Sequence, residues 1–279
     1  MGHTGTQGGV QTLQALLGLT HSPSSDSDVE NTMLVAVDFE NPQQIIEHDS
    51  LENVNSQIGF AILDTRDLFT SSIENISTYN FATGNSKYCE RAFRQFLFGE
   101  SINEGKKSML KKIQRIIPES RNITLVGHDI TWDLRALSSL NSGFQKCRFL
   151  DTQRIAGQIL PLTDQSKRYS LHHLLTRFDC PFDKLHCAGN DANFTLRLLL
   201  LLAIHSVKNE RLSTCQEEIV TKLQNIASAP LPPPKLCPHD IASAQKQKRD
   251  ELKRQARVQE QERIKRVRAE KAKEKGRRR

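Results

Sequence analysis

The chain has 279 residues, 37% of them hydrophobic and 25% charged, which allows one sizeable folded domain with appended segments. Its most apolar run is far shorter than the roughly 20 residues of a membrane span, and its first nine residues are polar and glycine-rich, so we expect neither a membrane helix nor a signal peptide. The net charge of +7 is uneven, because the last 40 residues hold 16 Lys and Arg against 7 Asp and Glu. Any affinity for a polyanion that comes from bulk charge therefore belongs mainly to this tail.

The first half of the chain predicts mostly strands. In chain order we expect a short amphipathic helix at 10–19, a Ser- and Asp-rich loop at 21–30, buried strands at 33–37 and 58–63, weaker strand signals within 73–81 and an edge strand at 96–98.

The second half alternates helices and strands. We expect a helix at 106–117, a strand at 123–127, a helix at 129–140, a strand at 148–151, a helix capped by Ser170, and helices at 190–206 and 212–226. This order predicts an α/β fold, with a mixed sheet flanked by helices.

The segment boundaries follow from composition. Residues 1–31 form a lead-in, 32–227 the folded domain, 228–239 a Pro-rich linker and 240–279 a charged tail that is helical or disordered. The six cysteines are scattered without a C-x-x-C pair, so we expect reduced thiols in an intracellular setting, the cytoplasm or the nucleus, rather than a disulfide framework.

Carboxylates follow two of the expected buried strands. Asp38 and Glu40 stand at i and i+2 near the end of the first strand, so both side chains point to one face of the sheet. Two carboxylates held together repel each other, and a hard divalent cation removes that penalty. Asp133 falls in the first turn of the helix after the 123–127 strand, where we expect Asp129 to be the N-cap.

A third acidic position comes later in the chain. Asp191 falls in the first turn of the apolar helix at 190–206, with His186 in the loop before it. Each residue alone has an ordinary explanation: a carboxylate is favoured at a helix N-terminus, and His186 reads equally as a surface histidine. Their order and structural contexts together favour a shared site.

Three motifs resemble the DEDDh exonuclease family of the ribonuclease H-like superfamily. Asp38-Phe39-Glu40 matches its Asp-x-Glu motif, residues 127–133 match Gly-His-Asn-x-x-aromatic-Asp, and His186 to Asp191 match His-x-x-x-x-Asp. Weaker matches are Asp151-Thr152 and the Leu-His-His-Leu-Leu run at 171–175.

The resemblance covers about residues 33–206, and the wording of the last motif is similar to a mostly fungal branch with members linked to mRNA export and quelling. One departure is Asp129, where the family generally has Asn. The aromatic position is Trp132, for which core packing is a sufficient explanation.

The resemblance implies a metal-dependent 3′-to-5′ exonuclease that releases nucleoside 5′-monophosphates. Asp38, Glu40, Asp133 and Asp191 would hold two divalent ions, Mg²⁺ or Mn²⁺, and His186 would be the general base. The substrate would be a nucleic acid with a 3′ end, with single-stranded RNA favoured over DNA, and a protein partner in RNA metabolism is also expected.

The tail has two explanations. It lacks aromatic residues, so it is either a solvated charged helix or disordered segment, or an arm that attracts nucleic acid without stacking on bases. Its clusters also fit nuclear import. The candidate nucleic-acid-binding residues are Lys265, Arg266, Arg268, Arg277, Arg278 and Arg279.

Two other functions remain open at this level. The fold could be retained as a non-catalytic scaffold that binds RNA or protein, for which Asp129 is the one hint. A structural adaptor acting through the tail is weaker, because Leu252, Ile264 and Val267 do not sustain the heptad of a coiled coil. Metal-dependent nucleotide release separates these functions.

Overall fold

The described part of the chain forms a seven-stranded mixed sheet with the order β1-β7-β6-β2-β3-β4-β5. This computed structural model describes residues 3–20, 31–47, 54–69, 76–160 and 169–233, together with residues 235, 249, 251 and 254. The strands are β1 (Gln7–Gly8), β2 (Thr32–Glu40), β3 (Ser56–Asp64), β4 (Ser77–Thr83), β5 (Ser101–Ile102), β6 (Asn122–Gly127) and β7 (Arg148–Asp151). β3 is antiparallel to β2 and β4, and the other pairs are parallel.

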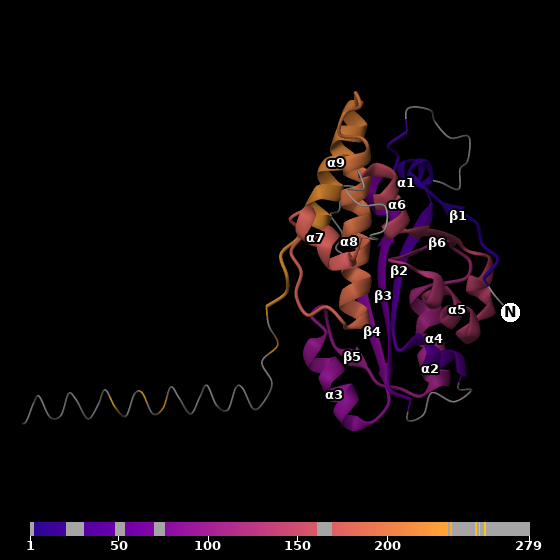
Figure 1. Ribbon diagram of the computed structural model, residues 1–279, viewed down its shortest axis with the longest axis vertical. Coiled ribbons are helices and arrows are strands. Elements are labelled where there is room, and N and C mark those ends of the chain that lie inside the picture. Colours follow the sequence, from indigo (N-terminus) through magenta and orange to yellow (C-terminus); the bar gives the residue numbers. More distant parts are fainter. Residues whose placement is uncertain are drawn as a thin grey trace, which may run out of the picture. The chain divides into compact units, whose positions relative to one another are not determined.

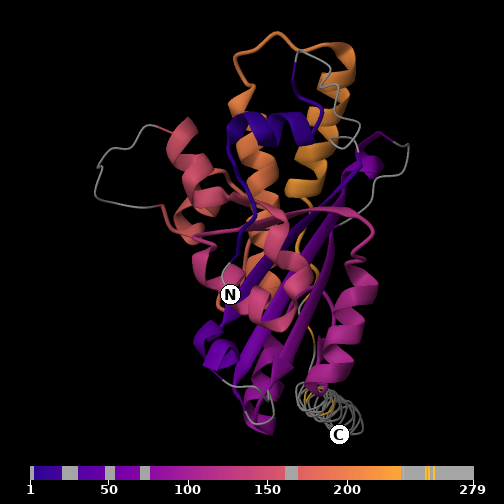
Figure 2. The ribbon, with the colours of Figure 1, turned by 90° about the vertical axis from the view of Figure 1, so that its right-hand side faces the viewer.

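Helices cover both faces of this sheet (Figures 1 and 2). They are α1 (Val10–Leu16), α2 (Pro42–Glu47), α3 (Ser86–Gln95), α4 (Lys106–Ile116), α5 (Thr131–Leu140), α6 (Thr152–Ile159), α7 (Leu171–Arg177), α8 (Ala188–Ser206) and α9 (Thr214–Ala227), with 3₁₀ turns η1 (Thr65–Phe69) and η2 (Ser142–Lys146). One core lies between the sheet and α1, α6, α7, α8 and α9, and the other lies between the sheet and α2, α4 and α5. The mixed α/β architecture is confirmed, and it is consistent with a ribonuclease H-like fold.

Strand β2 separates the two cores. Its residues 33, 35, 37 and 39 pack toward α4 and α5, whereas residues 34 and 36 pack toward α8. Because side chains alternate along a strand, Asp38 and Glu40 continue the α8 face. The residues at the start of α8 therefore determine which side chains lie next to Asp38 and Glu40.

The N-terminal segment is part of this architecture. β1 pairs with β7, and Leu13, Leu16, Leu17 and Leu19 are at most 1% exposed in the core against α8. Burial of four leucine side chains stabilises the fold by several kcal/mol, at about 1.5–3 kcal/mol each. Residues 7–19 of the lead-in are thus packed against the rest of the folded domain.

The strand expected at 96–98 does not form. Phe96 and Leu97 are buried after the end of α3, and the Leu97 N–H donates to the Asn190 side chain instead of a strand neighbour. The edge position next to β4 belongs to β5. Helices α2, α3 and α6 have no counterpart among the expected elements. The other expected strands and helices are present, with ends shifted by a few residues.

The chain divides into two compact units, Met1–Pro233 and Pro234–Arg279. Residues 230–233 have no regular structure, as expected for the proline run. The expected boundaries at residues 31, 227 and 239 stay predictions, and most of the predicted tail lies outside the described residues.

None of the helices in the described ranges is long and apolar enough to cross a bilayer.

Candidate active site

The first two carboxylates stand at the end of β2. The strand stops there because Asn41 adopts a left-handed conformation (φ 61°), which Asn tolerates better than most residues, and Pro42 then begins α2. The Glu40 carbonyl accepts a hydrogen bond from the Ser56 hydroxyl at 2.7 Å, which holds the strand end against β3. Asp38 and Glu40 are both partly buried.

Asp133 occupies a gap beside the same strand. β6 pairs with β2 only as far as Ala36 and Val126, so β2 extends beyond its neighbour. The Phe39 N–H, which has no strand partner on that side, donates instead to Asp133 Oδ1 at 3.1 Å. Asp133 is only 8% exposed. Its expected place in the first turn of α5 is confirmed.

Asp129 is not the N-cap of α5. Ile130 flanks the helix, and Asp129 has φ 56°, a left-handed conformation that cannot serve as the usual extended cap. The Asp129 N–H donates to Asp151 Oδ1 at 3.1 Å, which holds the turn in this conformation. The Asp151–Thr152 pair noted in the sequence thus supports the turn that delivers Asp133.

Asp191 comes from the buried start of α8 and is 7% exposed. Its Oδ2 accepts the His186 backbone N–H at 2.9 Å. Its Oδ1 is buried and has no hydrogen-bond partner among the described residues. A buried oxygen of this kind carries a large desolvation cost, unless something outside the protein chain binds it.

Glycine allows the start of α8 to approach β3, the strand next to β2. Gly59 is the cross-strand partner of Asp38, and a Cβ built on it would lie 1.9 Å from the Ala188 carbonyl oxygen. The side chain of the neighbouring Asn190 accepts from the Leu97 N–H and donates to the carbonyls of Gln95 and Lys184. These contacts fix where Asp191 lies.

The charges of the three other carboxylates all act on Asp38. Burial raises the pKa of Asp38 well above its usual range, and the charges of Asp133, Asp191 and Glu40 raise it further. Carboxylates from β2, α5 and α8 therefore all lie within electrostatic range of Asp38. Their mutual repulsion is the condition that a bound cation relieves.

The pKa values of the other three carboxyl groups are also raised. Burial is the main cause that raises the pKa of Asp133 to about 8. The hydrogen bond from Phe39 lowers this pKa, and the charges of Asp129 and Asp151 raise it. Burial raises the pKa of Asp191 to about 7, against the hydrogen bond from the His186 backbone. Burial raises that of Glu40 too, while His186 and Arg91 lower it.

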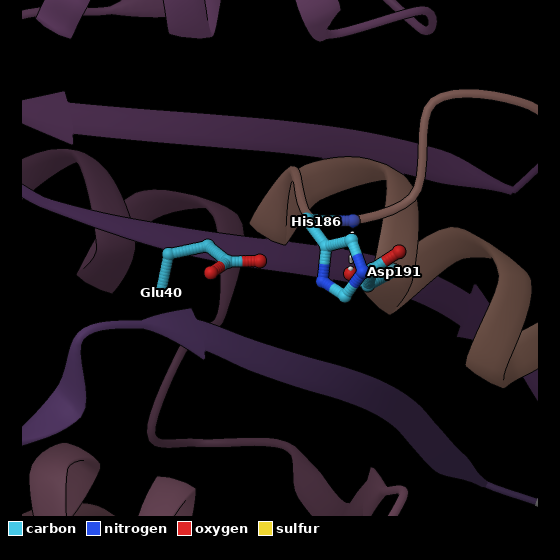
Figure 3. Close-up of side chains that lie close together, drawn as sticks. All are labelled: Glu40, His186 and Asp191. Atoms are coloured by element: carbon cyan, nitrogen blue, oxygen red, sulfur yellow. Dashed lines mark hydrogen bonds between the residues drawn. The ribbon is translucent and has the colours of Figure 1, made fainter. Parts of the chain in front are cut away.

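His186 lies at the exposed side of this cluster. Ligand atoms of Glu40, His186 and Asp191 lie within 4.8 Å of one another, a grouping that fits a metal ion. Figure 3 shows the Glu40 carboxylate directed toward the imidazole, with Asp191 behind the ring. His186 has φ 64°, a strained conformation that its backbone bond to Asp191 helps to maintain. The five site residues predicted from the sequence are thus brought together.

A divalent ion fits this arrangement. The carboxylate oxygens are the hard ligands that Mg²⁺ and Mn²⁺ prefer, and Asp191 Oδ1 lacks any other partner among the described residues.

The core interpretation of Trp132 is wrong. Its side chain is 46% exposed, and the Arg135 guanidinium lies 4.9 Å from its ring centroid. Trp132 precedes the inward-facing Asp133, and successive residues of a helix point in different directions. The carboxylate takes the buried direction, so the aromatic ring is left at the surface.

Two residues near Glu40 were not foreseen. Tyr88 and Arg91 of α3 both interact electrostatically with Glu40. The helix was missed although its apolar residues recur at helical spacing, at positions 88, 89, 92 and 93. The Asn85 side chain, which caps α3 by accepting the Tyr88 N–H at 2.9 Å, was a second available signal.

The six tail residues proposed for nucleic-acid binding lie outside the described residues.

Comparison with known families gives one match. The family model described as DNA polymerase III subunit epsilon-like, C-terminal domain (DEDDh_C) matches residues 33–202, which is more than half of the chain and includes all five site residues. No curated protein matches the chain.

Proposed function

The chain belongs to the DEDDh exonuclease family, and from that membership we propose that it removes nucleoside 5′-monophosphates one at a time from the 3′ end of a nucleic acid. A nucleic-acid exonuclease is what the family match indicates, and members of the family generally use divalent metals. The direction, the RNA preference and the assignment of roles to individual residues are our proposals. The branch of the family also stays a prediction.

One observation carries the proposal. Asp38, Glu40, Asp133 and Asp191 arrive from three elements at one buried point, where Asp191 Oδ1 has no partner among the described residues. A fold that only bound RNA or protein would have no use for three carboxylates that all raise the pKa of a fourth, Asp38. Their convergence favours catalysis over the non-catalytic scaffold.

The four carboxylates would hold two divalent ions, Mg²⁺ or Mn²⁺. Such ions supply activation of a water molecule and stabilisation of the leaving oxygen when bound. The chain itself contributes the positions of the oxygens: Asp133 is oriented by the Phe39 N–H and Asp191 by the His186 N–H. These bonds fix the geometry before substrate arrives.

His186 would accept the proton of the attacking water. Its ring is exposed, stands beside Glu40, and is carried on a backbone tied to Asp191, so it can meet a water on the substrate side of the carboxylates. The water oxygen then forms a bond to phosphorus, the bond to the 3′-oxygen of the preceding nucleotide breaks, and a nucleoside 5′-monophosphate leaves.

RNA is proposed as the favoured substrate because the sequence of the motif at 186–191 resembles a branch of the family linked to mRNA export and quelling. The basic tail would provide a further contact with the nucleic acid. The proposed intracellular setting is supported by the five cysteines in the described residues, all of which are free.

The test is release of label from 3′-labelled single- and double-stranded RNA and DNA oligonucleotides. We expect release with Mg²⁺ or Mn²⁺, its loss on chelation by EDTA, and recovery with excess Mg²⁺. Asp191→Asn and His186→Ala should abolish release while thermal unfolding shows an intact fold. Unchanged activity in both variants would remove the mechanism, and no release by the wild-type chain on any substrate would favour the scaffold.

A further inference from the structure

Helix α3 places an exposed arginine within electrostatic range of Glu40, one of the four clustered carboxylates. Arg91 is exposed, and its positive charge lowers the pKa of Glu40 and that of Tyr88. It lies within electrostatic range of Glu40, yet its side chain makes no ion pair or hydrogen bond with any described residue. Its guanidinium donors are therefore available to a ligand.

The position of Arg91 is set by a firmly held helix. Asn85 caps α3, and its own N–H donates to Asn55 Oδ1 at 3.1 Å. The Gln57 and Asn41 side chains lie close enough to the Tyr88 hydroxyl to lower its pKa, and the nearby charge of Glu40 raises it. Tyr88 and Arg91 are three residues apart, so they share one side of the helix. Because Tyr88 lies near Gln57, Asn41 and Glu40, Arg91 also lies near Glu40.

The other end of α3 is tied to the loop that carries His186. Lys184 Nζ donates to the Arg94 carbonyl at 3.1 Å, and Asn190 at the start of α8 donates to the Gln95 carbonyl. Figure 1 shows α3 beside the N-terminal end of α8. These bonds therefore hold α3 against the loop of His186, and the charges of both Arg91 and His186 act on Glu40.

We propose that Arg91 binds a phosphate of the substrate beside the carboxylate cluster. A guanidinium presents its donors as a planar fork that matches phosphate oxygens, and charge-assisted bonds of this kind are stronger than neutral ones. In the proposed reaction, the anion that arrives next to Glu40 is a phosphodiester. This inference rests on the proposed exonuclease function.

A narrower role for Arg91 is to offset the charge of Glu40. The two roles differ in what they change. A phosphate contact affects oligonucleotide affinity and its salt dependence, whereas charge compensation affects the affinity of the cluster for divalent ions.

The protein-side test compares Arg91→Ala and Arg91→Lys with Arg115→Ala, which removes the same charge from an exposed position on α4. Loss of a charge-assisted phosphate contact should raise KM about tenfold or more, with kcat within about twofold. The slope of log affinity against log salt should become shallower by about one. Arg91→Lys should keep the salt slope and recover only part of the affinity, and Arg115→Ala should match wild type.

The ligand-side test removes the phosphate charge. Single-stranded oligonucleotides with a neutral methylphosphonate at one of the last three linkages are bound to full-length protein carrying His186→Ala, and fluorescence anisotropy reads affinity. At one linkage the neutral group should weaken binding by the Arg91 protein but have no further effect when Arg91→Ala is also present. Additive losses at every linkage would overturn the proposal.

The exonuclease function and the Arg91 phosphate contact can be refuted independently of each other. A wild-type chain that releases no nucleotide refutes the exonuclease, while anisotropy still reports the Arg91 contact. A change in Mn²⁺ affinity on Arg91→Ala, with unchanged oligonucleotide affinity and salt slope, overturns the phosphate contact and assigns Arg91 to Glu40 alone.

Discussion

Replacement of Gly59 by Ala perturbs the site without touching any of its functional side chains. The added Cβ would lie 1.9 Å from the Ala188 carbonyl oxygen, 2.0 Å from the Ala188 carbonyl carbon and 2.4 Å from the Gly189 nitrogen. All three are backbone atoms, so no side chain can rotate away. Restoring ordinary contact requires the start of α8 to move from β3 by on the order of 1 Å.

Two consequences of different size follow. Overpacking of this kind costs about 1–3 kcal/mol of stability, which lowers Tm by about 2–4 °C per kcal/mol in a body of this length. The same shift separates Asp191 from Asp38, the cross-strand partner of Gly59. A misplacement of about 1 Å costs about 100-fold in rate. Activity should therefore fall far more than stability.

The measurement pairs thermal unfolding with nucleotide release. Gly157→Ala in α6 is the control, because a Cβ there meets nothing within 4 Å. It should raise stability by about 0.5–1 kcal/mol and leave the rate unchanged. A folded Gly59→Ala protein with wild-type activity would refute the reasoning that the helix start and β3 set the carboxylate geometry.

Three further outcomes are expected. Because burial raises the pKa of Asp133 to about 8 and of Asp191 to about 7, the metal-free folded protein holds protons that the unfolded chain loses above about pH 4. Its stability should fall between about pH 4 and 8, and Mg²⁺ should offset the fall most at the upper end. A Tm in EDTA that rises through this range would contradict the shifts. Trp132→Ala should change the free energy of unfolding by less than about 1 kcal/mol, because the ring is exposed and loses mainly its contact with Arg135. A loss of about 3 kcal/mol in urea unfolding would restore the core interpretation. A chain ending at Pro234 should bind oligonucleotides more weakly at low salt and with a shallower salt dependence. Identical binding curves would give the tail another role.

Local patterns predicted the parts of the site that depend on one element at a time. The alternation of β2 placed Asp38 and Glu40 on one face, and the apolar period after His186 placed Asp191 in a first helical turn. Both are properties of neighbouring residues in the chain. The resemblance to a family supplied the assembly of these separate pieces.

The remaining features depend on contacts between distant segments. The need for glycine at position 59 could not be predicted, because it depends on the close approach of α8 to β3. The apolar spacing of α3 could have predicted the helix that carries Arg91, but the proximity of Arg91 to Glu40 comes from tertiary packing. Trp132 was misjudged because an aromatic residue is usually buried, while the helical turn gave that direction to Asp133.

The most direct measurement is the number of Mn²⁺ ions bound per chain at neutral pH, followed by electron paramagnetic resonance. Wild type and Arg115→Ala should each bind about two ions. Asp38→Asn should bind fewer or bind them more weakly, because Asp38 interacts with all three other carboxylates. Equal Mn²⁺ binding by wild type and Asp38→Asn would contradict a shared metal site.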